Sequence, residues 1–570
     1  MILRLPAAAA AISVFALAAC GQGDKAPATN VSEPAADETA AEASGDLAFA
    51  PIDEAKLRER IATLASDEFE GRAPATPGGA KTRDYLIAQM KEIGLEPGNG
   101  DSYEQAVPLV ELTADADASN LSINGETLEL GPEAVYWTKR VQENVSFENS
   151  EMVFVGYGVV APEYGWNDYA DVDVTGKTVV ILVNDPGYAT EDPELFNGKS
   201  MTYYGRWTYK YEEAARQGAA AALVIHQTAP ASYGWGVVEG SWSGAQLDLE
   251  RPDGGASRTA LEGWIQESVA RDLFTKAGMD FDAVTASAQE RGFKAQPMTG
   301  LSASATLKNT IRRSNSANVA GLLPGTEHPD EYVLYMGHWD HNGVGVPDAE
   351  GDNIWNGAVD NATGTAGILS IAQSFIESEV KPKRSILFVA VTAEESGLLG
   401  SAYLGEAPIV PFAQIVGGIN IDAILPAPPT KDLIVVGYGA SELEDLLKKA
   451  ADKRDMYLRP DATPEAGYFY RSDHISLAKK GVPMLYADAG IDLVEGGEEA
   501  GRAFGEDYTA NRYHKPSDEY SPDWDLTGMV KSLSILQEVG AEMAYTDIWP
   551  NWYEGNEFRA LRDEQRSAAE

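Results

Sequence analysis

The chain has 570 residues, more than one ordinary hydrophobic core can hold, so we expect two or more domains. Its 44 basic and 88 acidic residues give a net charge of -44, which argues against the basic face that nucleic-acid binding requires. The hydrophobic content of 44% and the charged content of 23% are ordinary for a soluble globular protein. We therefore expect an acidic, solvated surface and no nucleic-acid partner.

The first residues are typical of a targeting segment. Arg4 supplies a positive charge, and the apolar run from Ala7 to Leu17 is too short to span a bilayer. The run ends in Leu17-Ala-Ala-Cys20, which resembles a bacterial lipobox. The resemblance implies a lipoprotein signal peptide over residues 1–19, lipidation of Cys20 and a membrane contact through that lipid alone. An ordinary signal peptide with a chance cysteine is the alternative.

The cysteine is followed by Gly21 rather than by aspartate. This position resembles that of Gram-negative lipoproteins that are sorted to the outer membrane. We expect a cell-envelope protein that faces the periplasm or the cell surface. Cys20 is the only cysteine, so no disulfide can form within the chain. Residues 20–46 contain almost no large apolar side chain and are predicted to be a disordered tether.

Ordered structure is expected from about residue 47. Helical spacing of apolar residues predicts helices over 53–65 and 78–93, and Gly94 is the expected C-cap. From residue 111 to 305 the pattern changes to short β-branched segments separated by Gly, Pro, Asn and Asp, which predicts a separate, mainly β module. Its aromatic tract from Met201 to Tyr211 is interpreted as packing, with a substrate-binding wall as the alternative.

Beyond residue 316 the pattern predicts strands that alternate with helices up to about residue 548. A charged tail follows over 549–570, and it is expected to fray after Glu557. This alternation predicts an α/β fold, with a mixed β-sheet sandwiched by helices. The strands are expected at 331–336, 385–392, 415–421, 432–436 and 483–486, and the helices at 363–377, 441–453 and 526–545.

Metal-ligating side chains follow three of these strands. His338 and Asp340 come after the first strand, Glu394 and Glu395 after the second, and Asp422 after the third. Such strand ends gather ligand groups at one edge of an α/β sheet. Asp360 precedes a helix, and His514 lies in a late loop. Taken singly, each of these residues is weak evidence for a metal site, because an aspartate at a strand end is often only a cap.

The joint set suits two cations. A carboxylate bridges two ions more readily than an imidazole does, so the simplest arrangement has one bridging Asp and one His plus one carboxylate for each metal. A further Glu must stay free to move a proton. Mixed nitrogen and oxygen ligation suits zinc, and manganese or cobalt is also compatible.

The motifs Gly337-His-Trp-Asp-His341, GAVDNATG, TAEESG, NID and YHKPSD, in this order, resemble the family-28 di-zinc metallopeptidases, which include bacterial aminopeptidases and glutamate carboxypeptidase. The resemblance covers about 47–110 and 316–545. It implies two Zn²⁺ ions, a zinc-exopeptidase fold of phosphorylase/hydrolase-like type, and a protease-associated domain inserted over 111–305. It implies the metal ligands His338, Asp360 (bridging), Glu395, Asp422 and His514, the general base Glu394, an orienting Asp340, and Tyr513 as stabiliser of the tetrahedral intermediate.

Some features depart from the motifs or lie beside them. The 22-residue spacing from His338 to Asp360 is long, and this loop is interpreted as solvated rather than as shaping substrate entry. His341 and His474 are expected to be structural or to support the ligands. Arg471 is the nearest cation for a substrate carboxylate, and His226 and His328 are given no role.

The functional prediction is an aminopeptidase that acts on peptides with a free N-terminus through a bridging hydroxide on two zinc ions. A carboxypeptidase of the same fold, a glutaminyl-cyclase-like enzyme with one metal, and a non-catalytic receptor or binding module are the alternatives. The complete ligand set argues against the last two. The preferred terminal residue and the oligomeric state stay open.

Overall fold

The computed structural model describes residues 49–242 and 244–569, which belong to one compact unit. The expected signal peptide, Cys20 and the tether lie outside the described residues. No helix within the described part of the chain is long and apolar enough to cross a membrane.

The main sheet is mixed, as the sequence predicts. Its parallel centre comprises β17 (Arg384–Val391), β14 (His328–His338), β18 (Ile415–Asn420) and β21 (Met484–Ala489), in that spatial order. All eight residues of β17 are buried, as expected for a strand covered on both faces. Antiparallel strands extend both edges: β13 (Gln296–Leu323), β2 (Glu104–Ala114) and β11 (Ala245–Leu249) beyond β17, and β19 (Asp432–Val435), paired with β20 (Tyr457–Pro460), beyond β21.

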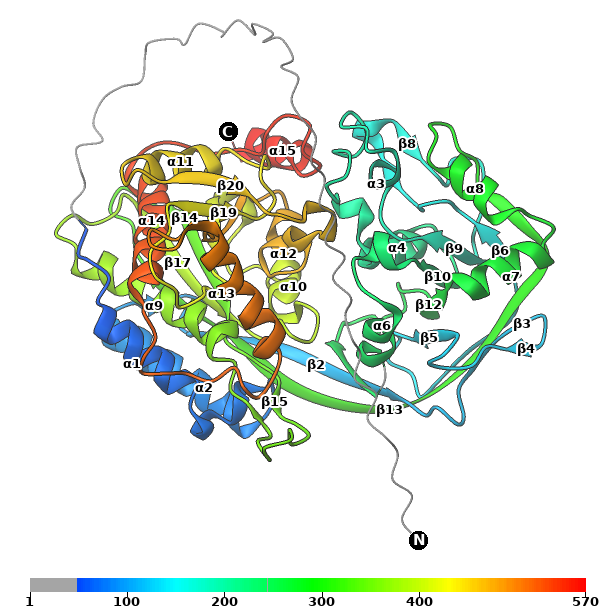
Figure 1. The fold of residues 1–570 in the computed structure, drawn as a ribbon, viewed down its shortest axis with the longest axis horizontal. Coiled ribbons are helices and arrows are strands. Elements are labelled where there is room, and N and C mark those ends of the chain that lie inside the picture. Colours follow the sequence, from blue (N-terminus) through cyan, green and yellow to red (C-terminus); the bar gives the residue numbers. More distant parts are fainter. Residues whose placement is uncertain (1–48, 243, 570) are drawn as a thin grey trace, which may run out of the picture. The chain divides into compact units, whose positions relative to one another are not determined.

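Helices cover both faces of this sheet (Figure 1). Alternate residues of β14 show the two faces, because side chains of a strand point to opposite sides. The Tyr335 hydroxyl donates to Leu536 O on α14 (Thr527–Tyr545) at 3.0 Å, whereas Leu334 packs in the apolar cluster of α12 (His474–Ala478) and α10 (Leu399–Glu406). The other helices of this part are α9 (Gly364–Glu377), α11 (Leu443–Asp452) and α13 (Gly497–Asn511), of which α13 was not predicted.

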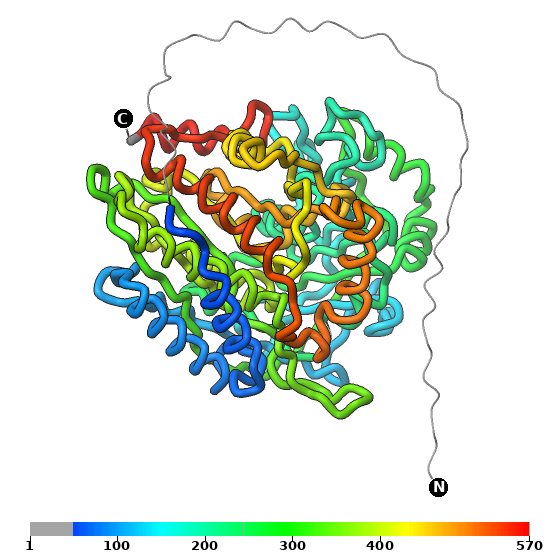
Figure 2. The backbone as a smooth tube through the Cα atoms, turned by 60° about the vertical axis from the view of Figure 1, so that its left-hand side comes forward, coloured from blue at the N-terminus to red at the C-terminus, as the bar shows by residue number. Residues whose placement is uncertain are grey.

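The N-terminal helices belong to the same layered structure. They are α1 (Glu54–Leu64) and α2 (Pro77–Ile93), with a short η1 (Asp67–Arg72) between them. Gly94 ends α2 with a φ of 98°, which confirms the predicted C-cap. Arg58 of α1 donates to Trp524 O at 2.9 Å, just before α14, so α1 lies close to the start of α14 (Figure 2).

Residues 111–305, called the insert below, form a second sheet, apart from β11, which pairs with β2 of the main sheet. Its order is β6 (Asn144–Phe154), β9 (Thr178–Leu182), β10 (Ala221–His226), β12 (Leu261–Gln266) and β5 (Ala134–Trp137), parallel as far as β12. β13 pairs with β6 and then continues into the main sheet (Figure 1). The insert also contains helices, of which α4 (Trp207–Arg216), α7 (Glu267–Lys276) and α8 (Phe281–Ala288) are the longest. Tyr209 and Tyr211 of α4 are buried, which supports the packing interpretation of the aromatic tract.

The C-terminal tail differs from the expectation that it frays after Glu557. It forms α15 (Arg559–Ala569), and Trp552 before it is fully buried, with its indole N–H donated to Gly481 O at 3.0 Å. The buried Arg562 donates to Ile415 O of β18 at 2.7 Å. The tail is charged overall, but these few side chains hold it against the sheet.

Candidate metal centre

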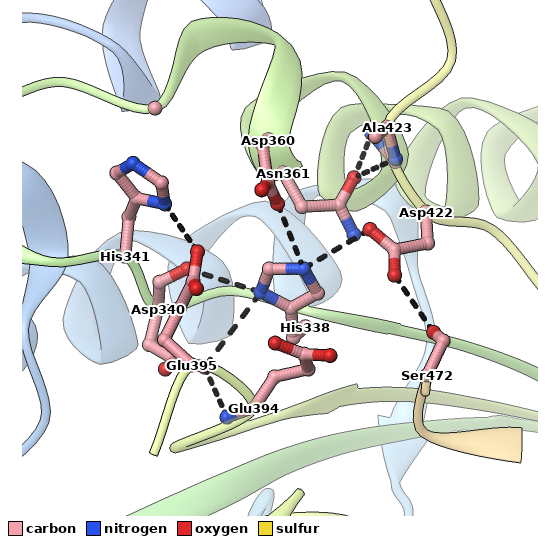
Figure 3. Close-up of polar contacts among 12 residues, drawn as sticks. His338, Asp340, His341, Asp360, Asn361, Glu394, Glu395, Asp422, Ala423 and Ser472 are labelled. Atoms are coloured by element: carbon pink, nitrogen blue, oxygen red, sulfur yellow. Dashed lines mark hydrogen bonds and ion pairs between the residues drawn. The ribbon is translucent and has the colours of Figure 1, made fainter. Parts of the chain in front are cut away.

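The parallel strands bring the predicted ligands together at one edge of the main sheet. His338 is the last residue of β14, and Asp422 lies two residues after β18. Glu394 and Glu395 follow β17 in a tight turn. Because neighbouring parallel strands end at the same edge, these side chains converge (Figure 3).

The first cluster is centred on His338, whose side chain is 1% exposed. Its Nε2 atom lies 3.1 Å from Asp360 Oδ1 and 3.1 Å from Asp422 Oδ1. On the other side of the ring, Nδ1 lies 3.1 Å from the backbone oxygen of Asp340 and 3.8 Å from its carboxylate. Asp340 therefore orients the ring mainly through its backbone carbonyl.

The second cluster uses the other oxygen of the same aspartate. His514 Nε2 lies 3.1 Å from Asp360 Oδ2 and 3.1 Å from Glu395 Oε2. Asp360 thus offers one oxygen to each histidine. In both clusters the nitrogen lies about as far from each oxygen as two ligands of one small cation lie from each other, since the ligands of tetrahedral zinc at about 2.0–2.1 Å lie about 3.3 Å apart. The donor set of nitrogen and carboxylate oxygen fits two such ions.

The charges within this centre are strongly coupled. Burial favours the neutral form of Asp360, but hydrogen bonds with His338 and His514 hold its pKa well below the usual value. Burial and Asp360 likewise oppose the charge of Glu395, yet His341 and His514 lower its pKa to about 2. Partial burial disfavours protonated His514, but its contacts with Asp360 and Glu395 raise its pKa to about 10. The chain alone therefore keeps the carboxylates ionised and pairs them with positive charge.

Glu394 differs from its neighbour Glu395. Its carboxylate makes no hydrogen bond with any described residue, while its backbone N–H donates to Asp340 Oδ1 at 3.1 Å. Burial, with additional repulsion from Glu395 and Asp422, raises the pKa of Glu394 well above the usual value despite the attraction of His338. This carboxylate is thus free and has a raised proton affinity, as a general base requires.

His341 contacts Glu395 of the second cluster. Its Nδ1 lies 2.5 Å from Glu395 Oε1, the oxygen that does not face His514, and the His341 side chain is fully buried. A cation could also lie between His341, Asp360 and Glu395. We favour His514 as the ligand, because its Nε2 contacts one oxygen of each carboxylate, and this leaves His341 to position Glu395. Tyr513 is 43% exposed, and its ring stacks on His514 with centroids 4.0 Å apart.

Several supporting residues escaped sequence reasoning. The Ser472 hydroxyl donates to Asp422 Oδ2 at 2.7 Å (Figure 3). Asn361 donates through Nδ2 to Ile421 O at 3.1 Å. Arg72 is buried, and its guanidinium holds both ligand loops through their carbonyls: it donates to Trp339 O, beside His338, and to Gly357 O, near Asp360. Only the neighbouring motif residues hinted at Ser472 and Asn361, and nothing in the pattern marked Arg72.

Strand β21 places two polar side chains near Asp422 that sequence reasoning did not identify. Tyr486 and Asp488 lie on the same face of the strand, two residues apart. Burial, followed by the carboxylates of Asp488 and Asp422, raises the pKa of Tyr486 well above the usual value. Asp488 Oδ1 is buried and has no hydrogen-bond partner among the described residues. His474 is completely buried beside Tyr486, as expected of a structural residue.

His338, at the end of a central parallel strand, and His514, in a late loop, contact opposite oxygens of one carboxylate, an arrangement that could hold two cations. Residues 318–536 match the family model described as peptidase family M28. The matched residues contain every member of the two clusters described above.

Individual relatives match over shorter stretches. The chain is 37% identical over 110 residues to a probable zinc metalloprotease of Pyrenophora teres f. teres (strain 0-1), which covers 19% of this chain and 23% of the relative. It is 34% identical over 120 residues to the aminopeptidase NAALADL1 of Rattus norvegicus, covering 20% and 14%. The chain thus spans a quarter or less of the length of these relatives. Among solved structures, an aminopeptidase from Aneurinibacillus sp. strain AM-1 aligns with a TM-score of 0.46 and 18% identity, over 87% of this chain and 94% of that one.

Proposed function

We propose that this protein is a di-zinc aminopeptidase that hydrolyses peptides with a free N-terminus. The observation that carries the proposal is the contact of His338 and His514 with the two different oxygens of Asp360, each at 3.1 Å. A bridging carboxylate with one histidine on each side is what a pair of adjacent cations needs. The proposed ligands are His338 and Asp422 for the first ion, Glu395 and His514 for the second, and Asp360 for both.

The bound ions would supply a Lewis acid for the peptide carbonyl and would lower the pKa of water. The side chains of the protein carry out the proton transfers. Glu394 accepts a proton from the attacking water, whose oxygen forms a bond to the carbonyl carbon. Glu394 then returns this proton to the amine nitrogen as the C–N bond breaks. The free carboxylate of Glu394 and its raised pKa support this role.

Two further residues have proposed roles. Asp340 holds the Nδ1 side of His338 through its carbonyl and receives the backbone N–H of Glu394 on its carboxylate, so it positions ligand and base together. Tyr513, stacked on His514, would donate its hydroxyl proton to the carbonyl oxygen as negative charge develops there.

Binding of the substrate through its N-terminus is supported by unpaired carboxylates of the site. Glu394 and Asp488 present carboxylate oxygens without hydrogen-bond partners among the described residues, and a free α-ammonium group would pair with such oxygens. The test compares leucine p-nitroanilide with its N-acetylated form. We expect cleavage of the substrate with the free amine only. Cleavage of only the N-acetylated substrate would refute the aminopeptidase proposal.

A carboxypeptidase of the same fold is the second candidate, because Arg471, a cation that could pair with a substrate carboxylate, directly precedes Ser472 in the sequence, and the Ser472 hydroxyl contacts Asp422. The two functions differ in which peptide they reject. An aminopeptidase cleaves Leu-Gly-NH₂ and rejects N-acetyl-Leu-Gly, whereas a carboxypeptidase does the reverse.

We also propose that Cys20 anchors the protein by a lipid in the outer membrane, although this residue lies outside the described part. The Leu17-Ala-Ala-Cys20 sequence supports this proposal. Changing Cys20→Ser should move the protein from the membrane fraction to the soluble fraction of the cell envelope. Unchanged fractionation would refute lipidation.

A further inference from the structure

Arg72, the last residue of η1, is a fully buried cation whose contacts are all with backbone. Within the described part of the chain its guanidinium donates only to carbonyl groups. Nη1 donates to Leu64 O at 2.7 Å and to Asn356 O at 2.6 Å. Nε donates to Trp339 O at 2.9 Å, and Nη2 donates to Gly357 O at 2.8 Å. The side chain therefore fixes the course of the backbone around it rather than the position of another side chain.

The carbonyl groups that Arg72 binds lie at the two ends of the long loop between two proposed zinc ligands. Trp339 directly follows His338, and Gly357 precedes Asp360 by three residues. The middle of this loop is exposed, so it does little to fix the distance between its ends. The guanidinium joins both ends through donors whose directions are fixed by one rigid plane. The separation of the two ligand backbones thus depends on this side chain.

The turn that carries Arg72 packs directly against the same loop. Gly71 and Arg72 have φ angles of 62° and 55°, in the left-handed region that is unfavourable for residues other than glycine. The loop forms a small hairpin of β15 (Gly343–Val344) and β16 (Ile354–Trp355). A Cβ atom on Gly71 would lie 2.5 and 2.6 Å from carbonyl oxygens of β16 and β15. Such a backbone persists only where its surroundings enforce it, and it indicates a functional constraint on the turn.

We propose that Arg72 is a positioning residue for both zinc ions, and that it acts through the geometry of the loop that it closes rather than through its charge. This inference rests on the proposed di-zinc function, in which His338 binds the first ion and Asp360 binds both. An arginine that fixes the backbone beside each of these two ligands sets how well they can bind the ions together.

Charge and geometry make opposite predictions for zinc binding. Burial lowers the pKa of Arg72 to about 10, against the attraction of Asp518, Asp340, Asp360 and Glu395, so the guanidinium stays charged at neutral pH. A nearby positive charge repels metal ions, and its removal alone would strengthen zinc binding. Loss of the closed loop would instead misplace two ligands and weaken zinc binding. The sign of the change therefore separates the two effects.

The test measures the zinc affinity of the full chain by competition with a zinc-binding dye, after bound metal has been removed with a chelator. Arg72→Met removes the charge and the hydrogen bonds, and we expect both ions to bind about 10- to 100-fold more weakly. Arg72→Lys keeps the charge, but an ammonium group lacks the planar fork that reaches four carbonyls, so we expect weaker binding again. Unchanged or tighter binding in Arg72→Met would overturn the proposal, as would unchanged affinity in Arg72→Lys.

A matched control comes from the opposite end of the main sheet. Arg384, the first residue of β17, is also fully buried and donates to three backbone carbonyls. Arg384→Met should lower the melting temperature as Arg72→Met does, because each variant leaves buried carbonyls without donors. Its zinc affinity should equal that of the unchanged protein. Equal weakening of zinc binding in both variants would show a general loss of stability and would overturn the proposal. If Arg72→Met fails to fold, Arg72→Lys decides alone.

These measurements separate the role of Arg72 from the proposed function, because zinc binding needs no cleavage. If leucine p-nitroanilide is cleaved but both Arg72 variants bind zinc normally, the role of Arg72 is rejected and the aminopeptidase proposal stands. Weaker zinc binding in both variants supports the role of Arg72 even if no peptide is cleaved. Failure of the unchanged protein to bind zinc would refute the di-zinc centre itself, and the role of Arg72 with it.

Discussion

The carboxylate of Asp518 accepts the backbone N–H of Asp360 at 3.1 Å, and it also accepts the N–H of Val359. The loop that carries His514 is thereby tied to the loop that carries Asp360, and the side chains of these two residues meet at 3.1 Å. The YHKPSD motif therefore contributes twice: once as a ligand and once as the support of the bridging residue.

Asp518→Ala should weaken zinc binding by about 10- to 100-fold, which is the usual effect of removing a residue that orients a metal ligand. The reason is that Asp360 loses the backbone contacts that aim both of its oxygens. Competition with a zinc-binding dye measures the affinity. Asp523→Ala, an exposed residue nearby, is the control, and equal affinities of the two variants would refute the supporting role.

Glu394→Gln should bind two zinc ions like the unchanged protein but lose most turnover, on the order of 10²-fold or more. The amide keeps the size of the side chain but cannot accept the proton. Metal content by atomic emission and kcat on leucine p-nitroanilide form the two measurements. A variant that keeps full kcat would eliminate Glu394 as the general base, and a variant that loses a metal would instead make it a ligand.

His341→Ala should weaken the second zinc site selectively, because Glu395 loses the 2.5 Å contact that fixes its carboxylate. We expect one zinc ion to remain tightly bound and the other to dissociate about 10- to 100-fold more readily. Stepwise removal with a chelator resolves the two ions. His328→Ala, an exposed histidine at the other end of β14, should leave both sites unchanged, and equal weakening of both sites in His341→Ala would contradict the assignment.

Zinc binding at pH 7 should release about two protons per chain. His514 has a raised pKa of about 10, and contacts with the carboxylates, opposing burial, raise the pKa of His338 well above its usual value, so both are protonated before the metal enters. Both must lose the proton to bind zinc, so affinity rises with pH until the pKa of His514 is passed. Titration calorimetry in buffers of different ionisation enthalpy counts the protons, and no release would show that neither histidine is a ligand.

Most strands and helices of the main sheet could be predicted from periodicity. The strand expected at 385–392 is β17, and the helix expected at 363–377 is α9, each within one residue. These elements are long and buried, so their apolar patterns are unambiguous. The pattern failed at α13, which is mostly exposed, and in the tail, where Trp552 and Arg562 are buried by distant partners rather than by local periodicity.

The sequence by itself determined which residues could form the centre, because metal ligands are restricted to few residue types and follow strands whose ends coincide. Only the tertiary structure decided how they are held. The contacts of Arg72 with Gly357 and of Ser472 with Asp422 join residues 285 and 50 positions apart, and no local pattern encodes such pairs.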